Sequence, residues 1–179
     1  MPKYKDQWVK LGEQIMEGSK VKEITLKGKL YKFSYSKEDF MEVARSKGWP
    51  EEFTVLGKLT TLEQVAENYK AVQADYISDF KSDYCLNSGG FGSGKSIALY
   101  VKLILLCKCF PGNRVLLGRK TLSDIDRAVL PELFDLIPES WYEHRVKDGL
   151  INFSNGSQII LFGLDAMQSG NIADIKKAQ

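Results

Sequence analysis

The chain has 179 residues, of which 44% are hydrophobic and 27% are charged, and its formal net charge is +2. This composition is typical of a globular protein with one ordinary core, or with one domain and an appendage. A charge so close to neutral neither requires nor excludes a DNA-binding surface, because local patches matter more than the sum.

The sequence argues against a metal-binding, a secreted or a membrane-spanning protein. Cysteines stand at Cys85, Cys107 and Cys109, an odd number whose spacing suits no common metal site, so we expect buried, reduced thiols. The N-terminus is polar, and the apolar run at 101–106 is too short to cross a bilayer. These features predict a cytosolic protein.

Residues 1–62 are predicted to form a small α+β N-terminal appendage. Apolar residues alternate over 22–35 around the turn Lys27-Gly28-Lys29, which indicates a hairpin. Ser36 then resembles a helix cap, and Lys47-Gly48-Trp49-Pro50 would end that helix. A basic module with aromatic side chains could contact nucleic acid or a partner, whereas the simpler interpretation is an appendage packed on the main domain.

The following segment alternates helices with strands. The predicted elements are a helix at 62–80 capped by Thr61, a buried strand at 84–87, an apolar helix over 97–106, a strand at 114–118 and a helix at 123–137 that Pro131 kinks or divides. Alternating strands and helices with short loops indicate a parallel, doubly wound α/β sheet.

The end of the chain predicts an antiparallel meander. Asp148-Gly149 and Asn155-Gly156 are signals of type I′ hairpins, and they separate runs at 142–147, 150–154 and 157–163. The last run is apolar enough to join the main sheet, and the tail at 169–179 is expected to form a short helix.

Residues 89–96 match the P-loop pattern G-x-x-x-x-G-K-[ST]. Glycines let backbone N–H groups turn toward phosphate oxygens, and the helix that starts here directs its positive end at the anion. Lys95 can reach the β- and γ-phosphates, and the Ser96 hydroxyl can ligate Mg²⁺. The predicted phosphate-binding set is Gly89, Gly90, Phe91, Gly92, Ser93, Gly94, Lys95 and Ser96. Strand, loop and helix together predict an incomplete P-loop NTPase-type three-layer sandwich.

Arg119 and Gln73 are further candidates. Arg119 follows the strand at 114–118, at the edge where open α/β sheets bind ligands, so it could contact phosphate or pair at the surface with Asp124 or Asp126. The amide of Gln73 could donate to and accept from adenine, and the alternative is an exposed polar position on a helix.

Asp165 and His144 are weaker candidates. Asp165 follows the apolar run at 159–162 but is displaced from it, which favours a loop residue or cap over a Mg²⁺-binding carboxylate. His144 has no Ser or Cys nucleophile nearby in the sequence, so no catalytic role is predicted for it.

Taken together, these motifs resemble the N-terminal ATPase part of the large terminase subunit of tailed bacteriophages, the genome-packaging motor. The resemblance covers roughly residues 70–165 and is more specific than the P-loop alone. The segments that carry it are Val72-Gln73, 86–96, 115–121, 130–133 and 155–165.

The resemblance implies an ATP-driven translocase that moves double-stranded DNA into a procapsid in the host cell cytoplasm. It implies ATP and Mg²⁺ as cofactors, a homo-oligomeric ring, and a portal protein and a small terminase subunit as partners. By the family pattern Gln73 would contact adenine, 89–96 would hold the phosphates with Lys95, and Arg119 would contact phosphate or the transition state. Residues 63–179 would be the ATPase domain.

The chain departs from the family after the strand at 157–163. The family continues with an apolar run ending in Asp-Glu, a coupling motif and a nuclease domain, and this sequence stops at Gln179 before them. We therefore expect a domain truncated before the Walker B strand that binds nucleotide weakly and hydrolyses ATP poorly or not at all alone. The alternatives are another P-loop enzyme, such as a helicase-like ATPase or a kinase, and a non-hydrolysing fragment that binds nucleotide or DNA.

Overall fold

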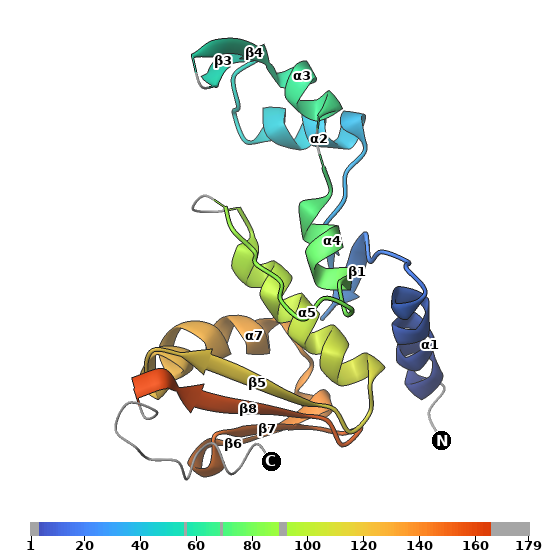
Figure 1. The fold of residues 1–179 in the computed structure, drawn as a ribbon, viewed down its shortest axis with the longest axis vertical. Helices are drawn as coiled ribbons and strands as arrows, with labels where there is room; N and C mark the ends of the chain where they lie inside the picture. The colour runs from blue at the N-terminus through green and yellow to red at the C-terminus, as the bar shows by residue number, and fades with distance from the viewer. Residues whose placement is uncertain (1–3, 56, 69, 90–92, 166–179) are drawn as a thin grey trace.

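The computed structural model describes residues 4–55, 57–68, 70–89 and 93–165. It is a mixed α/β structure in which a body with a four-stranded sheet carries a smaller unit at one end (Figure 1). This unit, residues 37–67, is called the distal module below. Within the described ranges, no helix is both long and apolar enough to cross a membrane.

The main sheet has the strand order β5-β8-β7-β6. β5 (Arg114–Arg119) is parallel to β8 (Gln158–Gly163), whereas β7 (Leu150–Phe153) is antiparallel to both β8 and β6 (Tyr142–Arg145). The predicted meander is confirmed, and so is the pairing of its last strand with the main sheet. Among the described strands, only β5 and β8 have the parallel arrangement that the alternating pattern predicted.

The turns of the meander are not type I′. That turn needs a positive φ at both central residues, and here Gly149 (φ 62°) and Gly156 (φ 87°) have one, whereas Asp148 and Asn155 do not. The short 3-10 helix η3 (Val146–Asp148) connects β6 to β7 instead, and another, η2 (Glu139–Trp141), precedes β6.

The central helix α5 (Lys95–Cys109) crosses one face of the sheet and is also contacted by α1 and α4 (Figure 1). Because neighbours enclose it, its sequence is apolar on most faces rather than on a single stripe. Its buried side chains are Ala98, Tyr100, Val101, Leu103, Ile104, Leu105, Cys107 and Cys109. Burial of this helix therefore fixes the position of the residues at its first turn.

Side chains from the loop between β7 and β8 cap the C-terminus of α5. Asn155 Nδ2 donates to the carbonyl of Cys107 at 2.8 Å. The Ser157 hydroxyl lies 2.8 Å from the same carbonyl and 3.0 Å from that of Phe110. The last carbonyls of a helix have no partner within it, so the Asn-Gly-Ser sequence satisfies groups of α5 as well as reversing the chain.

Helix α1 (Tyr4–Met16), which sequence analysis did not predict, packs against α5. A Cβ atom at Gly12 would lie 2.8 Å from the Cβ of Cys109, so the helices approach as closely as they do because residue 12 is glycine. The predicted hairpin follows as β1 (Glu23–Leu26) and β2 (Lys29–Lys32), joined through positive φ at Lys27 and Gly28.

The distal module consists of α2 (Lys37–Ser46), the unpredicted hairpin β3 (Glu52–Val55) and β4 (Lys58–Thr61), and α3 (Leu62–Glu67). Both predicted caps are confirmed: Ser36 accepts from the Asp39 N–H at 3.1 Å, and Thr61 forms a capping box with Gln64. Lys37 joins the two helices, with its Nζ 2.8 Å from Glu63 and 2.9 Å from Glu67.

Two predicted elements differ from the structure. The helix expected at 62–80 is divided into α3 and α4 (Val72–Ser78), because Asn68 ends α3 by donating to the Gln64 carbonyl. The strand expected at 84–87 is absent from the described strands, and Tyr84 and Leu86 are 94% and 91% exposed, since no neighbouring strand covers them.

The helix expected at 123–137 is divided, as Pro131 suggested. It consists of α6 (Leu122–Asp124), a π-helical segment η1 (Ile125–Val129) and α7 (Leu130–Leu136), in whose first turn Pro131 lies. Proline lacks an N–H, so it is tolerated where the first turn of a helix needs no donor.

Candidate functional site

The candidate phosphate loop leads into the first turn of α5. Gly94 precedes this helix with φ 76°, a left-handed conformation that favours glycine. The Gln73 Nε2 at the start of α4 donates to the carbonyl of Ser93, and a Cβ atom at Gly94 would lie 2.8 Å from that nitrogen. The predicted residues Gly90, Phe91 and Gly92 lie outside the described residues. The described part nonetheless brings Gln73 to the loop, although they are far apart in sequence.

The side chain of Lys95 folds back onto the same loop. Its Nζ donates to the Gly89 carbonyl at 2.8 Å and to the Ser93 Oγ at 3.2 Å. Asn87 Nδ2 is 3.4 Å from the Lys95 carbonyl, which ties the preceding segment to the helix. An anion that entered the loop could replace these neutral acceptors of Lys95 with charged oxygens, which make stronger hydrogen bonds to an ammonium group.

Tyr100, one helical turn after Ser96 on α5, lies near two charged residues, Glu132 and Arg119. Burial, and then the neighbouring Glu132 carboxylate, raise the pKa of Tyr100 to about 12, while Arg119 and the Ser96 hydroxyl act in the opposite direction. Arg119 ends β5, and its Nη1 is 3.5 Å from the Asp124 carbonyl. Glu132 and Tyr100 are not among the residues predicted from the sequence, although Glu132 lies in the segment 130–133 that carries part of the family resemblance.

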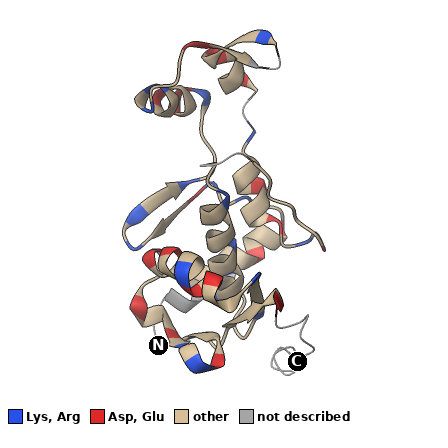
Figure 2. Cartoon of the chain, turned by 90° about the vertical axis from the view of Figure 1, so that its left-hand side faces the viewer, with Lys and Arg blue, Asp and Glu red and all other residues tan. Residues whose placement is uncertain are grey.

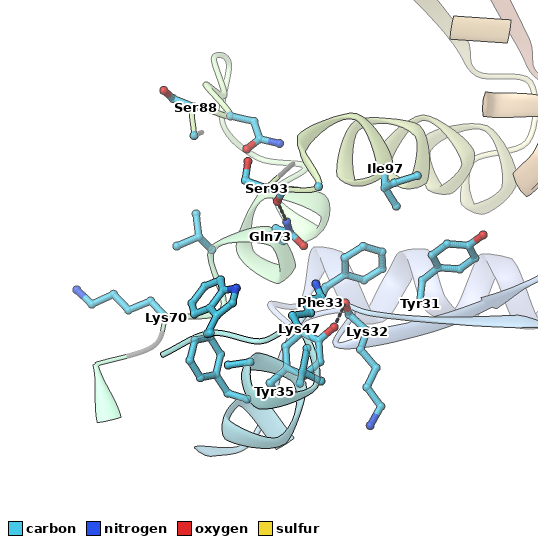
Figure 3. A pocket seen from close by; sticks show the side chains of 18 residues that line it. Tyr31, Lys32, Phe33, Tyr35, Lys47, Lys70, Gln73, Ser88, Ser93 and Ile97 are labelled. Atoms are coloured by element: carbon cyan, nitrogen blue, oxygen red, sulfur yellow. Dashed lines mark hydrogen bonds between the residues drawn. The ribbon is translucent and has the colours of Figure 1, made fainter. Parts of the chain in front are cut away.

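A pocket of about 580 Å³ lies between the candidate loop and the distal module (Figure 3). Figure 3 shows Gln73 next to Ser93, with Tyr31 and Phe33 of the hairpin region and Lys47 of the distal module around the same space. The lining residues are Tyr31, Lys32, Phe33, Tyr35, Phe40, Val43, Ala44, Lys47, Trp49, Lys70, Val72, Gln73, Asn87, Ser88, Gly89, Ser93, Gly94 and Ile97. The pocket thus joins an aromatic and basic wall to the candidate phosphate loop.

The two weaker candidates lie at other places on the sheet. The N–H of Asp165, which follows β8, donates to the Lys120 carbonyl at 3.0 Å. His144 lies in β6, at the opposite edge of the sheet from β5, with its ring 5.3 Å from that of Phe134. Among the residues that the structure describes, no three His, Cys, Asp or Glu side chains group closely enough to hold a metal ion.

The cysteines are all free, as expected, and two of the three are buried. Burial raises the pKa of Cys107 and of Cys109 from 9.0 to about 12. Cys85 is exposed, and its Sγ donates to the Asp79 carboxylate at 2.9 Å. The prediction of buried thiols is therefore confirmed for the pair on α5 and wrong for Cys85.

The stability of the protein is expected to fall as the pH rises from about 9 to about 12, by up to about 1.4 kcal/mol per pH unit for each buried thiol. The folded pKa of each thiol lies above the unfolded value, so its contribution is complete below pH 9 and is lost as the pH approaches 12. Urea unfolding at several pH values measures this. Cys107→Ala should flatten the dependence, and an unchanged slope in that variant would contradict the assignment.

Comparison of the chain with protein-family models, with curated proteins and with solved structures returned no match.

Proposed function

We propose that the chain binds ATP and Mg²⁺ at the loop before α5, as the nucleotide-binding part of an ATP-driven motor of the terminase type. The observation that carries the proposal is the convergence of Lys95, Gln73 and the first turn of α5 on one loop that borders a pocket. We also propose that the fold is a P-loop NTPase-type three-layer sandwich. This is supported by the order of elements along the chain, in which the loop is followed by helix α5 and by the parallel strands β5 and β8.

The residues present fit a triphosphate with its metal ion. The backbone N–H groups at the start of α5 have no partner within the helix, and the helix dipole favours an anion there. Lys95 would exchange its loop acceptors for phosphate oxygens. Ser96 is exposed at the first turn, where its hydroxyl could complete a Mg²⁺ shell made mainly of phosphate oxygens and water. Arg119, near Tyr100, is the candidate for neutralising charge that develops on the phosphates.

The DNA-related part of the proposal rests on the sequence resemblance. It includes translocation of double-stranded DNA, a homo-oligomeric ring, and a portal protein and a small terminase subunit as partners in the host cell cytoplasm. Figure 2 shows basic and acidic residues interspersed over the elements in that view, in keeping with the net charge of +2. DNA binding would therefore depend on a few local basic residues rather than on a broad basic face.

Replacing Lys95 by alanine is expected to weaken ATP binding by about tenfold or more, since hydrogen bonds to charged groups contribute about 1.5–3 kcal/mol. Equilibrium dialysis with labelled ATP, with and without Mg²⁺, measures the affinity. Lys147→Ala is the matched control, because it removes one exposed lysine from η3, away from the loop. Equal ATP affinity in the wild type and in Lys95→Ala would refute the proposal.

A further inference from the structure

We propose that the N-terminal region forms the nucleobase-binding wall of this site, with Trp49 as the side chain on which the base stacks. This inference rests on the proposed function and adds to it. In this arrangement the loop before α5 holds the phosphates, and the distal module recognises the base. Residues 1–62 would thus take part in nucleotide binding and would not be merely an appendage packed on the main domain.

The pocket is continuous from the candidate phosphate loop to the distal module. One cavity is bordered by Gly89, Ser93 and Gly94 at one side and by Phe40 and Trp49 of the distal module at another. Its volume of about 580 Å³ falls within the range of roughly 300–1,000 Å³ that is usual for small-molecule sites. A ligand whose phosphates lie in the loop therefore has room for its remaining part against the module.

Trp49 is exposed, and its backbone is held in place by hydrogen bonds. The side chain is 47% exposed, although it lines a pocket, and its ring meets that of Phe40 edge-on at 6.2 Å and 84°. Its backbone N–H donates to the Ala44 carbonyl at 3.0 Å, and the preceding Gly48 has φ 72° and donates to Arg45 at 2.9 Å. These bonds form the Schellman motif that ends α2. The backbone of Trp49 is thus fixed, and its ring lies against that of Phe40, before any ligand arrives.

The charged side chains that line the pocket are basic. Three lysines, Lys32, Lys47 and Lys70, line the pocket, and no Asp or Glu is found among the described residues that line it. The Nζ atom of Lys32 lies 3.9 Å from the Asp39 carboxylate, a long distance for an ion pair. An aromatic wall with several cations and no carboxylates suits a ligand that combines a flat ring with multiple negative charges, which describes a nucleoside triphosphate.

We expect the distal module to fold without the Trp49 side chain. Among the residues of the module whose burial the structure describes, Ala44, Leu62 and Ala66 are buried. Trp49 is 47% exposed, and Trp49→Ala keeps these buried residues and the backbone hydrogen bonds that end α2, so the variant is expected to fold. Leu59→Ala is the matched control, since Leu59 is a 69% exposed apolar residue on β4 of the same module and does not line the pocket.

The test compares ATP with inorganic tripolyphosphate, which has the phosphates without a base, by isothermal titration calorimetry. Trp49→Ala is expected to weaken ATP binding by about tenfold, a typical loss for one stacked base, and to leave tripolyphosphate binding unchanged. Leu59→Ala should bind both like the wild type, and Lys95→Ala should lose affinity for both. As a second readout, ATP should change the tryptophan fluorescence of the wild type but not that of Trp49→Phe.

The outcomes separate this inference from the proposed function. If Trp49→Ala binds ATP like the wild type while Lys95→Ala does not, the stacking role of Trp49 is refuted. The phosphate-binding role of the loop before α5 is then still supported. If Trp49→Ala loses ATP and tripolyphosphate equally, Trp49 has a structural role and the inference fails. If Lys95→Ala binds both ligands normally, the proposed function itself fails. If Trp49→Ala weakens binding of a single-stranded oligonucleotide but not of ATP, the wall belongs to a nucleic-acid site and the inference is overturned.

Discussion

Replacing Ile104 by alanine is expected to lower the free energy of unfolding by about 2–5 kcal/mol. Ile104 is fully buried in the middle of α5, which is packed among the sheet, α1 and α4. The substitution removes buried methyl and methylene groups and leaves a cavity that neighbours on several sides would have to fill together. Such a site relaxes poorly, which favours a large loss.

Urea unfolding of the wild type and of Ile104→Ala measures this loss. Leu116→Ala is the control, because Leu116 is 54% exposed on β5 and its removal should cost much less. A loss in Ile104→Ala no larger than in the control would show that α5 is not the centre of the folded core. Addition of ATP should raise the stability of both variants, since a ligand that binds only the folded state stabilises it by mass action.

Sequence patterns predicted α5 and the meander because their signals are local. The apolar run after Lys95 is too continuous for a surface helix, and the two Xaa-Gly turns divide the last strands at regular intervals. The strand at 84–87 was predicted from the same kind of apolar run. A strand, however, forms only where another strand lies beside it and shares its hydrogen bonds. The apolar character of Tyr84 and Leu86 does not show whether such a partner strand is present.

In the candidate site, too, the sequence predicted the local feature and not the one that depends on distant residues. The loop at 89–96 could be recognised because its glycines, Lys95 and Ser96 lie within eight residues and each has a chemical role. The aromatic wall could not, because Trp49 is forty residues before the loop and reaches it only through the packing of the distal module. Glu132 escaped notice for a similar reason, since its link to Ser96 passes through the buried Tyr100.

Replacing Ser157 by alanine is expected to cost about 1–3 kcal/mol of stability, although it removes only one oxygen atom. Ser157 is the single fully buried polar residue within the described part of the chain. Its hydroxyl accepts from the Asn113 N–H at 3.2 Å and lies within hydrogen-bonding distance of the Cys107 and Phe110 carbonyls. Alanine would leave these backbone groups buried with fewer partners, and water cannot readily replace the hydroxyl there.

Urea unfolding of Ser157→Ala against Ser154→Ala, an exposed serine of the same loop, tests this expectation. Equal losses in the two variants would contradict it. The cap also sets the start of the parallel pair, because the Gln158 N–H donates to the Asn113 carbonyl at 2.8 Å next to Ser157. Ser157→Ala should therefore speed hydrogen exchange at the amides of Asn113 and Gln158 first. Since α5 carries the candidate phosphate loop at its other end, the same variant should bind ATP normally if the cap acts on stability alone.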